Sequence, residues 1–145
     1  MVLINIKKWA RDLFEGIFKT PAENVNMYLT QPTFVESILK QTGNHKEIFE
    51  SINSFLVAAK SVSFAMCVEL ARIKFEDLFS STIKQLLYNF PVDSLTSTGT
   101  PFWSGPKRAP DIMNFDASNS LHLDFVMYGA NLNAFNFGIE GMNPS

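Results

Sequence analysis

The chain has 145 residues, which fits one domain with a buried core. Hydrophobic residues make up 46% and charged residues 18%, a balance that excludes a disordered chain. Neither nucleic-acid binding nor a membrane span is expected, because the net charge of −2 comes without clustered Lys and Arg and no apolar run approaches the ~20 residues of a span.

Helical periodicity begins at the N-terminal end. Apolar residues recur at steps of three and four from Leu3 to Phe18, which predicts a helix with one buried face that is bounded by Pro21. Thr33 and Glu36 have the spacing of a capping box, in which the Thr33 hydroxyl accepts the N–H of Glu36. A short helix is therefore predicted to follow.

The same spacing predicts further helices within 48–79. The polar run 80–82 is expected to break that pattern and to cap another helix, which Pro91 ends. One of the polar residues 118–120 is expected to cap a last helix that Gly138 terminates. No convincing strand pattern appears, so the sequence predicts an all-α fold.

A long irregular loop is predicted over about 91–120, where the periodicity disappears. Its centre combines three prolines, two glycines, a Phe-Trp pair and a Lys-Arg pair, which no helix can contain. The aromatic pair can pin the loop to the core, and Trp103, Lys107 and Arg108 are candidate interaction residues for a partner. Alternatively, the two cations form salt bridges within the domain.

Candidate catalytic residues are few. Cys67, the only cysteine, excludes an internal disulfide framework, fits a reducing compartment and lies in an apolar helical stripe, so it is predicted to be a structural packing residue. His45 and His122 are too few to complete a zinc site with it. His122 and Asp124 are predicted to be surface polar residues, and no phosphate-binding glycine motif is present. We predict no catalytic, cofactor or metal site in this chain.

Six segments carry a resemblance to a known family. They follow one another in the order Trp9–Phe18, Pro21–Thr30, Gln85–Pro91, Phe102–Arg108, Phe115–Asp116 and Leu121–Val126. Together they are similar to the second catalytic cysteine half-domain of the ubiquitin-activating enzymes, which is helical. The resemblance covers almost the whole chain, and it implies a single helical domain over 1–145.

The resemblance also implies an activity for the parent enzyme, an ATP-dependent ligase of the cytoplasm and nucleus. Such an enzyme uses ATP and Mg²⁺ to adenylate the C-terminal carboxylate of ubiquitin. A cysteine thiolate then attacks the adenylate, and the resulting thioester is passed to a ubiquitin-conjugating enzyme. The implied partners are ubiquitin, conjugating enzymes and the adenylation domains of the parent chain.

The nucleophile of the family is expected outside this sequence. It lies in a Pro-x-Cys-Thr-Leu segment upstream of the position that matches Trp9, and these residues contain no such segment. Cys67 matches a different family position, before the stretch Ala71–Glu76. We therefore expect an excised fragment, with Met1 from expression, that shapes the thioester site and is inactive alone. The alternative is a non-catalytic helical adaptor that binds a protein through the loop at 91–120.

Overall fold

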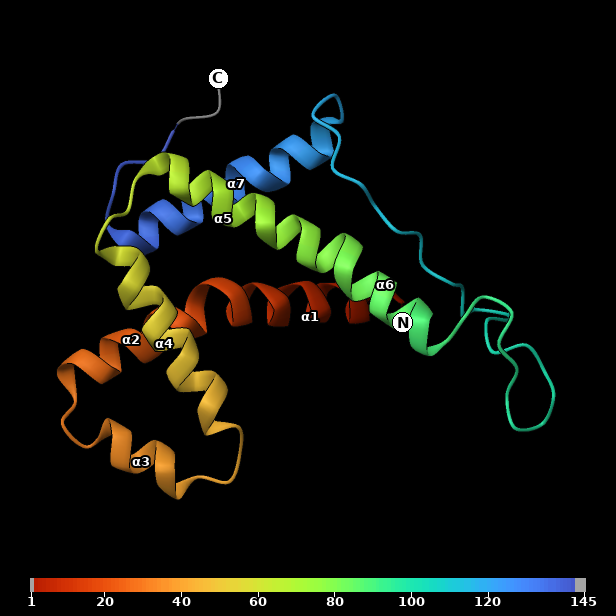
Figure 1. Ribbon diagram of the computed structural model, residues 1–145, viewed down its shortest axis with the longest axis horizontal. Coiled ribbons are helices and arrows are strands. Elements are labelled where there is room, and N and C mark those ends of the chain that lie inside the picture. The colour runs from red at the N-terminus through yellow and green to blue at the C-terminus, as the bar shows by residue number, and fades with distance from the viewer. Residues whose placement is uncertain (1, 143–145) are drawn as a thin grey trace. The chain divides into compact units, whose positions relative to one another are not determined.

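The computed structural model describes residues 2–142, and its regular elements are helices (Figure 1). The elements are α1 (Val2–Phe14), the π-helical turn η1 (Glu15–Lys19), α2 (Thr20–Thr30), α3 (Phe34–Lys40), α4 (His45–Ala59), α5 (Phe64–Glu76), the π-helical turn η2 (Asp77–Ser81), α6 (Thr82–Asn89) and α7 (Ser120–Phe137). Over these residues the extended backbone pairs only at an isolated bridge between Leu95 and Pro101. The prediction of an all-α fold is confirmed.

The chain divides into two compact units. Unit 1 comprises 1–64 and 132–141, and unit 2 comprises 65–131 and 142–145. The expected single domain over 1–145 stays a prediction, and the expectation about Met1 lies outside the described residues.

The core of unit 1 is formed where α2, α3 and α4 meet. Its buried residues are Val25, Phe34, Ile38 and Ile52. The end of α7 joins this unit through Phe137, whose ring stacks on Phe55 of α4 at 4.5 Å between centroids. In addition, Asn136 Nδ2 donates a hydrogen bond of 2.8 Å to the Phe18 carbonyl.

The core of unit 2 lies between α5 and the first part of α7, which run side by side (Figure 1). Its buried residues include Cys67, Ala71, Phe75, Ser80, Val126 and Ala130. Most of them are small, and a Cβ placed on Gly129 of α7 would lie 3.0 Å from the Cβ of Ala71 on α5. The two helices therefore pack at a distance that a side chain at Gly129 would prevent.

Both predicted helix breaks are wrong. The chain is continuously helical from α1 through η1 to α2, and from α5 through η2 to α6. In each π-helical turn the hydrogen bond reaches one residue further back: the N–H of Thr20 donates to the Glu15 carbonyl, and that of Thr82 to the Asp77 carbonyl. The widened turn η1 directly precedes Pro21. The proline ring would clash with the preceding turn of an ordinary α-helix, and the wider turn gives it more space.

The predicted capping box at Thr33 is also wrong in its detail. The helix begins at Phe34 as expected, but the Thr33 side chain makes no capping hydrogen bond. Thr33 has φ −91° and ψ 0°, not the extended backbone from which an N-cap hydroxyl reaches the first turn. The backbone carbonyl of Thr33 accepts the N–H of Ser37 at 2.9 Å instead.

The predicted loop and last helix are confirmed. No helix interrupts the chain between Asn89 and Ser120. Asn119 caps α7, because its Oδ1 accepts the N–H of Leu121 at 3.0 Å. Gly138 ends α7 at φ +69°, and the Ile139 N–H returns to the Ala134 carbonyl at 2.9 Å, as in a Schellman motif.

Candidate functional site

Cys67 lies in the core of unit 2. Its relative exposure is 0%, and burial raises the pKa of its thiol. A raised pKa lowers the fraction of thiolate, which is the nucleophilic form, and burial blocks a substrate from the sulfur. These two properties oppose a catalytic role for this cysteine.

The loop between α6 and α7 is held at its start by an aromatic stack, which we call the N-terminal anchor. Phe102 stacks on Phe90 with centroids 4.5 Å apart and an interplanar angle of 7°. Trp103 packs edge-on against Phe102 at 5.0 Å, and its Nε1–H donates a hydrogen bond of 2.9 Å to the Phe90 carbonyl. Lys107 Nζ lies 3.6 Å from the Phe102 ring centroid, which is cation–π distance.

A small hairpin-like turn lies inside this anchor. The Phe102 N–H donates to the Ser94 carbonyl, and the Thr96 N–H donates to the Thr100 carbonyl, both at 2.8 Å. Gly99, at φ +79°, has the left-handed conformation that closes this turn. The turn thereby brings Phe102 and Trp103 back to the end of α6.

The three candidate interaction residues therefore have different environments. Trp103 is half-buried and Lys107 is exposed, and both contact the N-terminal anchor. Arg108 is exposed. The ion pairs found within 2–142 include neither Lys107 nor Arg108, so the structure does not contain the intradomain salt bridges considered from sequence.

A second group of contacts, which we call the C-terminal anchor, holds loop residues 113–116. The Phe115 ring lies under the Arg72 guanidinium, 4.4 Å from its carbon, and packs edge-on against Phe75 at 5.4 Å. His122 lies 4.8 Å from Phe75 between ring centroids, and its Nδ1 accepts the Asp116 backbone N–H at 3.1 Å. The prediction that His122 is only a surface polar residue is wrong, because its ring is half-buried and contacts both α5 and the loop.

Asp116 closes the turn that leads into α7. Its Oδ1 accepts the backbone N–H of Ser118 at 2.8 Å and the Ser118 hydroxyl at 2.7 Å. These hydrogen bonds favour the carboxylate and hold the pKa of Asp116 below its ordinary value. The contact between His122 and Asp116 is therefore made by the Asp116 backbone N–H, while the Asp116 carboxylate binds Ser118.

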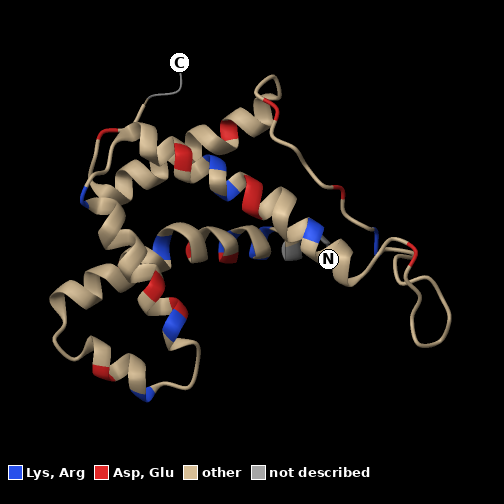
Figure 2. Cartoon of the chain, viewed as in Figure 1, with Lys and Arg blue, Asp and Glu red and all other residues tan. Residues whose placement is uncertain are grey.

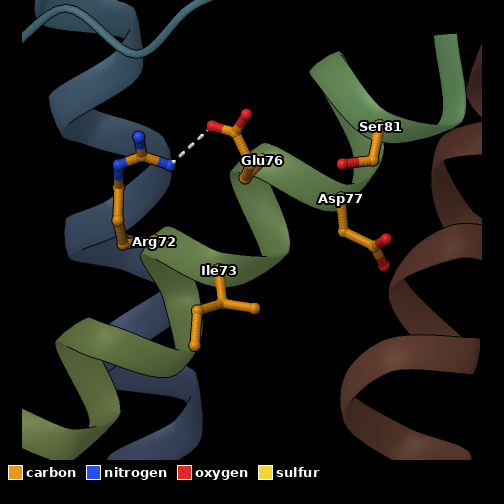
Figure 3. A pocket seen from close by; sticks show the side chains of 5 residues that line it. All are labelled: Arg72, Ile73, Glu76, Asp77 and Ser81. Carbon is orange, nitrogen blue, oxygen red and sulfur yellow. Dashed lines mark hydrogen bonds and ion pairs between the residues drawn. The ribbon is translucent and has the colours of Figure 1, made fainter. Parts of the chain in front are cut away.

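A shallow pocket lies along α5 and η2. It is lined by Arg72, Ile73, Glu76, Asp77 and Ser81 (Figure 3). Arg72 Nη1 lies 3.2 Å from Glu76 Oε2, and this ion pair favours the carboxylate form of Glu76.

The charge pattern does not favour a metal site. Acidic and basic residues are both present on several helices (Figure 2), and each ion pair within residues 2–142 joins positions three or four apart. Over residues 2–142, no three side chains of His, Cys, Asp or Glu are grouped so that they could hold a metal ion. Within the same range, no helix has both the length and the apolar character that crossing a bilayer requires.

Comparison with known proteins gives the family. The family model "Ubiquitin-activating enzyme, SCCH domain" matches residues 6–145. The chain belongs to this family. The match covers nearly all of the chain and agrees with the resemblance found in its motifs.

Individual relatives agree with this assignment. The chain is 54% identical over 132 residues to ubiquitin-activating enzyme E1 1 of Schizosaccharomyces pombe. It is 52% and 51% identical to ubiquitin-like modifier-activating enzyme 1 of Dictyostelium discoideum and of Homo sapiens, over 134 and 135 residues. Each alignment covers 91–92% of this chain but only 13% of the relative. The chain therefore spans about an eighth of the length of these relatives.

Sequence reasoning missed Arg72 and Phe115 as parts of the C-terminal anchor. Arg72 lies three residues before the buried Phe75 on α5, so its aliphatic stem shares a helix face with that ring. Phe115 is an isolated aromatic residue in a polar part of the loop, and such a residue often packs against a core. These two local signals are present in the sequence, but neither shows that Arg72 and Phe115 contact each other.

Proposed function

We propose that this SCCH domain is the scaffold part of an ATP-dependent, ligase-type ubiquitin-activating enzyme that works in the cytoplasm and nucleus. The parent enzyme adenylates the C-terminal carboxylate of ubiquitin, forms a thioester on a cysteine, and passes ubiquitin to a conjugating enzyme. The domain forms one wall of the thioester site and excludes water from it, which protects the thioester against hydrolysis.

The burial of Cys67 is the observation that supports a structural role for this domain and a nucleophile elsewhere in the parent enzyme. A thiol with 0% relative exposure and a raised pKa cannot meet the carboxyl terminus of a folded protein without unfolding around it. The nucleophile of the reaction then belongs to another part of the parent chain. This chain alone is inactive, and Cys67 fills space between α5 and α7.

We infer that ATP and Mg²⁺ do not bind to this chain. Its sequence has no phosphate-binding glycine motif, and its described part has no cluster of three metal-ligating side chains. Both therefore bind to the adenylation domains of the parent. Ubiquitin, the conjugating enzyme and those adenylation domains are the partners of this domain.

A segment exchange tests the proposal. In the fission yeast relative, the 132-residue segment that is 54% identical would be replaced by this chain, and thioester formation with ATP, Mg²⁺ and ubiquitin would be measured on non-reducing gels. We expect the chimaera to form a reducible ubiquitin adduct, and the chimaera with Cys67→Ala to form it equally well. The chain alone should form none.

Two controls make the result decisive. Circular dichroism establishes that the chain alone and the chimaera are helical, so a missing adduct cannot be assigned to unfolding. A reducible adduct on the chain alone that disappears with Cys67→Ala would overturn the assignment of Cys67. A folded chimaera without activity would overturn the role of the domain in the thioester reaction.

A further inference from the structure

The hydrogen bond between the loop and His122 needs one particular form of the imidazole. Nδ1 accepts the Asp116 backbone N–H at 3.1 Å, so this nitrogen carries no proton and the ring proton is on Nε2. An imidazolium has N–H groups at both nitrogens and cannot accept. We propose that His122 is an acid-sensitive latch: protonation of its ring breaks the hydrogen bond that holds the loop at Asp116 to α7, and this end of the loop loosens.

Some of the groups around the His122 ring favour its protonated form and others disfavour it. On α5, Arg72 is paired with Glu76, which leaves this side close to neutral. On α7, His122 lies in the first turn, where the helix dipole disfavours a cation. On the loop, the Asp116 carboxylate attracts an imidazolium, but it already accepts two hydrogen bonds from Ser118. A charged ring that turned to this carboxylate would still lose the Asp116 N–H.

Release would be confined to the C-terminal anchor. The same arm is also held by the Met113 N–H, which donates to the Phe79 carbonyl at 2.9 Å. The N-terminal anchor depends on the Trp103 Nε1–H and a lysine ammonium, neither of which changes charge in mildly acidic solution. Acid therefore loosens one end of the loop and leaves the other attached.

His45 provides a matched control within the chain. Its Nε2 contacts the Gln41 carbonyl, and a carbonyl can only accept. That contact therefore uses an N–H of the ring, which the imidazolium also has. Protonation of the two histidines should have different effects on their surroundings, although both rings make a hydrogen bond to the backbone.

Amide hydrogen exchange measured by NMR tests the latch. We expect the protection factor of the Asp116 amide, corrected for intrinsic exchange, to fall about tenfold between about pH 7.5 and about pH 5, the range in which histidine titrates. In His122→Asn the side-chain oxygen takes the place of Nδ1 and does not titrate, so protection should be constant over this range. His45→Asn should behave like the unmodified chain.

Three results would overturn the latch. The first is a protection factor in the unmodified chain that stays constant between the two conditions. The second is an equal fall in His122→Asn, which would assign the effect to another group. The third needs no substitution: nitrogen-15 shifts of the His122 ring that place the neutral-form proton on Nδ1 would contradict the hydrogen bond itself.

Discussion

Phe75 packs against several aromatic rings in the core of unit 2. Its relative exposure is 2%, and its ring contacts Phe79, Phe115, His122 and Phe125 at centroid distances of 4.8–5.7 Å. Replacing a buried Phe by Ala costs about 3–5 kcal/mol, and each aromatic pair adds about 0.5–1.5 kcal/mol beyond buried area. We therefore expect Phe75→Ala to lower the free energy of unfolding of unit 2 by about 4 kcal/mol.

Urea titration measures this loss in unit 2. A Trp9→Phe background leaves Trp103, a residue of unit 2, as the one fluorescent tryptophan, because the chain has two tryptophans. Tyr88→Ala is the control, since Tyr88 lies in unit 2, is 81% exposed, and its loss should cost under about 0.5 kcal/mol. If Phe75→Ala does not fold, Phe75→Leu should still show a loss of about 1–2 kcal/mol.

The local structure gives a second readout for the same variant. Without the Phe75 ring, Phe115 and His122 lose their shared contact on α5, so residues 113–116 should become accessible to protease before the helices unfold. A stability loss below about 1.5 kcal/mol in Phe75→Ala would refute the reasoning, because the site would then have relaxed around the missing ring.

Three further substitutions, one thiol reaction and one pH dependence test the packing. Gly129→Ala should cost about 1–3 kcal/mol, because its Cβ would lie 3.0 Å from that of Ala71, whereas Gly16→Ala, with nothing within 4 Å, should stabilise its helix by up to about 1 kcal/mol; urea titration measures both. Trp103→Phe should cost about 1 kcal/mol through loss of its hydrogen bond, in a urea titration followed by circular dichroism because this variant lacks the fluorescent probe. Cys67 should resist a thiol reagent until urea unfolds the chain, and prompt labelling in native buffer would contradict its burial. Since burial raises the pKa of the Cys67 thiol, the unfolded thiol ionises first, so urea titrations should show stability falling as pH rises above the ordinary thiol range.

Elements that depend on local signals could be predicted from sequence. Gly138 ends α7 because only a residue without a Cβ takes φ +69° easily. A glycine that follows an apolar helical stripe therefore predicts the end of the helix from sequence. The loop between α6 and α7 was visible for a similar reason, since its prolines and glycines exclude regular structure. Both signals act within a few residues, so no knowledge of the tertiary structure is needed.

The two π-helical turns could not be predicted in this way. A π-helical turn changes the hydrogen-bond partner from the fourth to the fifth preceding residue without requiring a particular residue type. Pro21 and the run 80–82 are ordinary break signals, and in this fold the helices continue through them with one widened turn each.

The environment of His122 could not be predicted from sequence for another reason. Its neighbours in sequence are Leu121 and Leu123, but its contacts are Phe75, 47 positions away, and the backbone of Asp116. Periodicity gives the face of α7 on which a residue lies, not which side chain of another helix covers that face. The same limit applies to Arg72 and Phe115.

The two anchors explain how a loop of this length stays ordered. Closing a long flexible segment costs conformational entropy, but the cost rises only slowly with length, so a few contacts at each end offset much of it. At both ends the contacts pair an aromatic ring with a cation, Lys107 over Phe102 and Arg72 over Phe115. Each end also has one hydrogen bond between a ring nitrogen and the backbone, in which Trp103 donates and His122 accepts. Lys107 therefore contributes to the N-terminal anchor, whereas the contacts that define the two anchors do not involve the exposed Arg108. A charge reversal at Arg108 tests partner binding without disturbing the loop, whereas the same change at Lys107 would alter both.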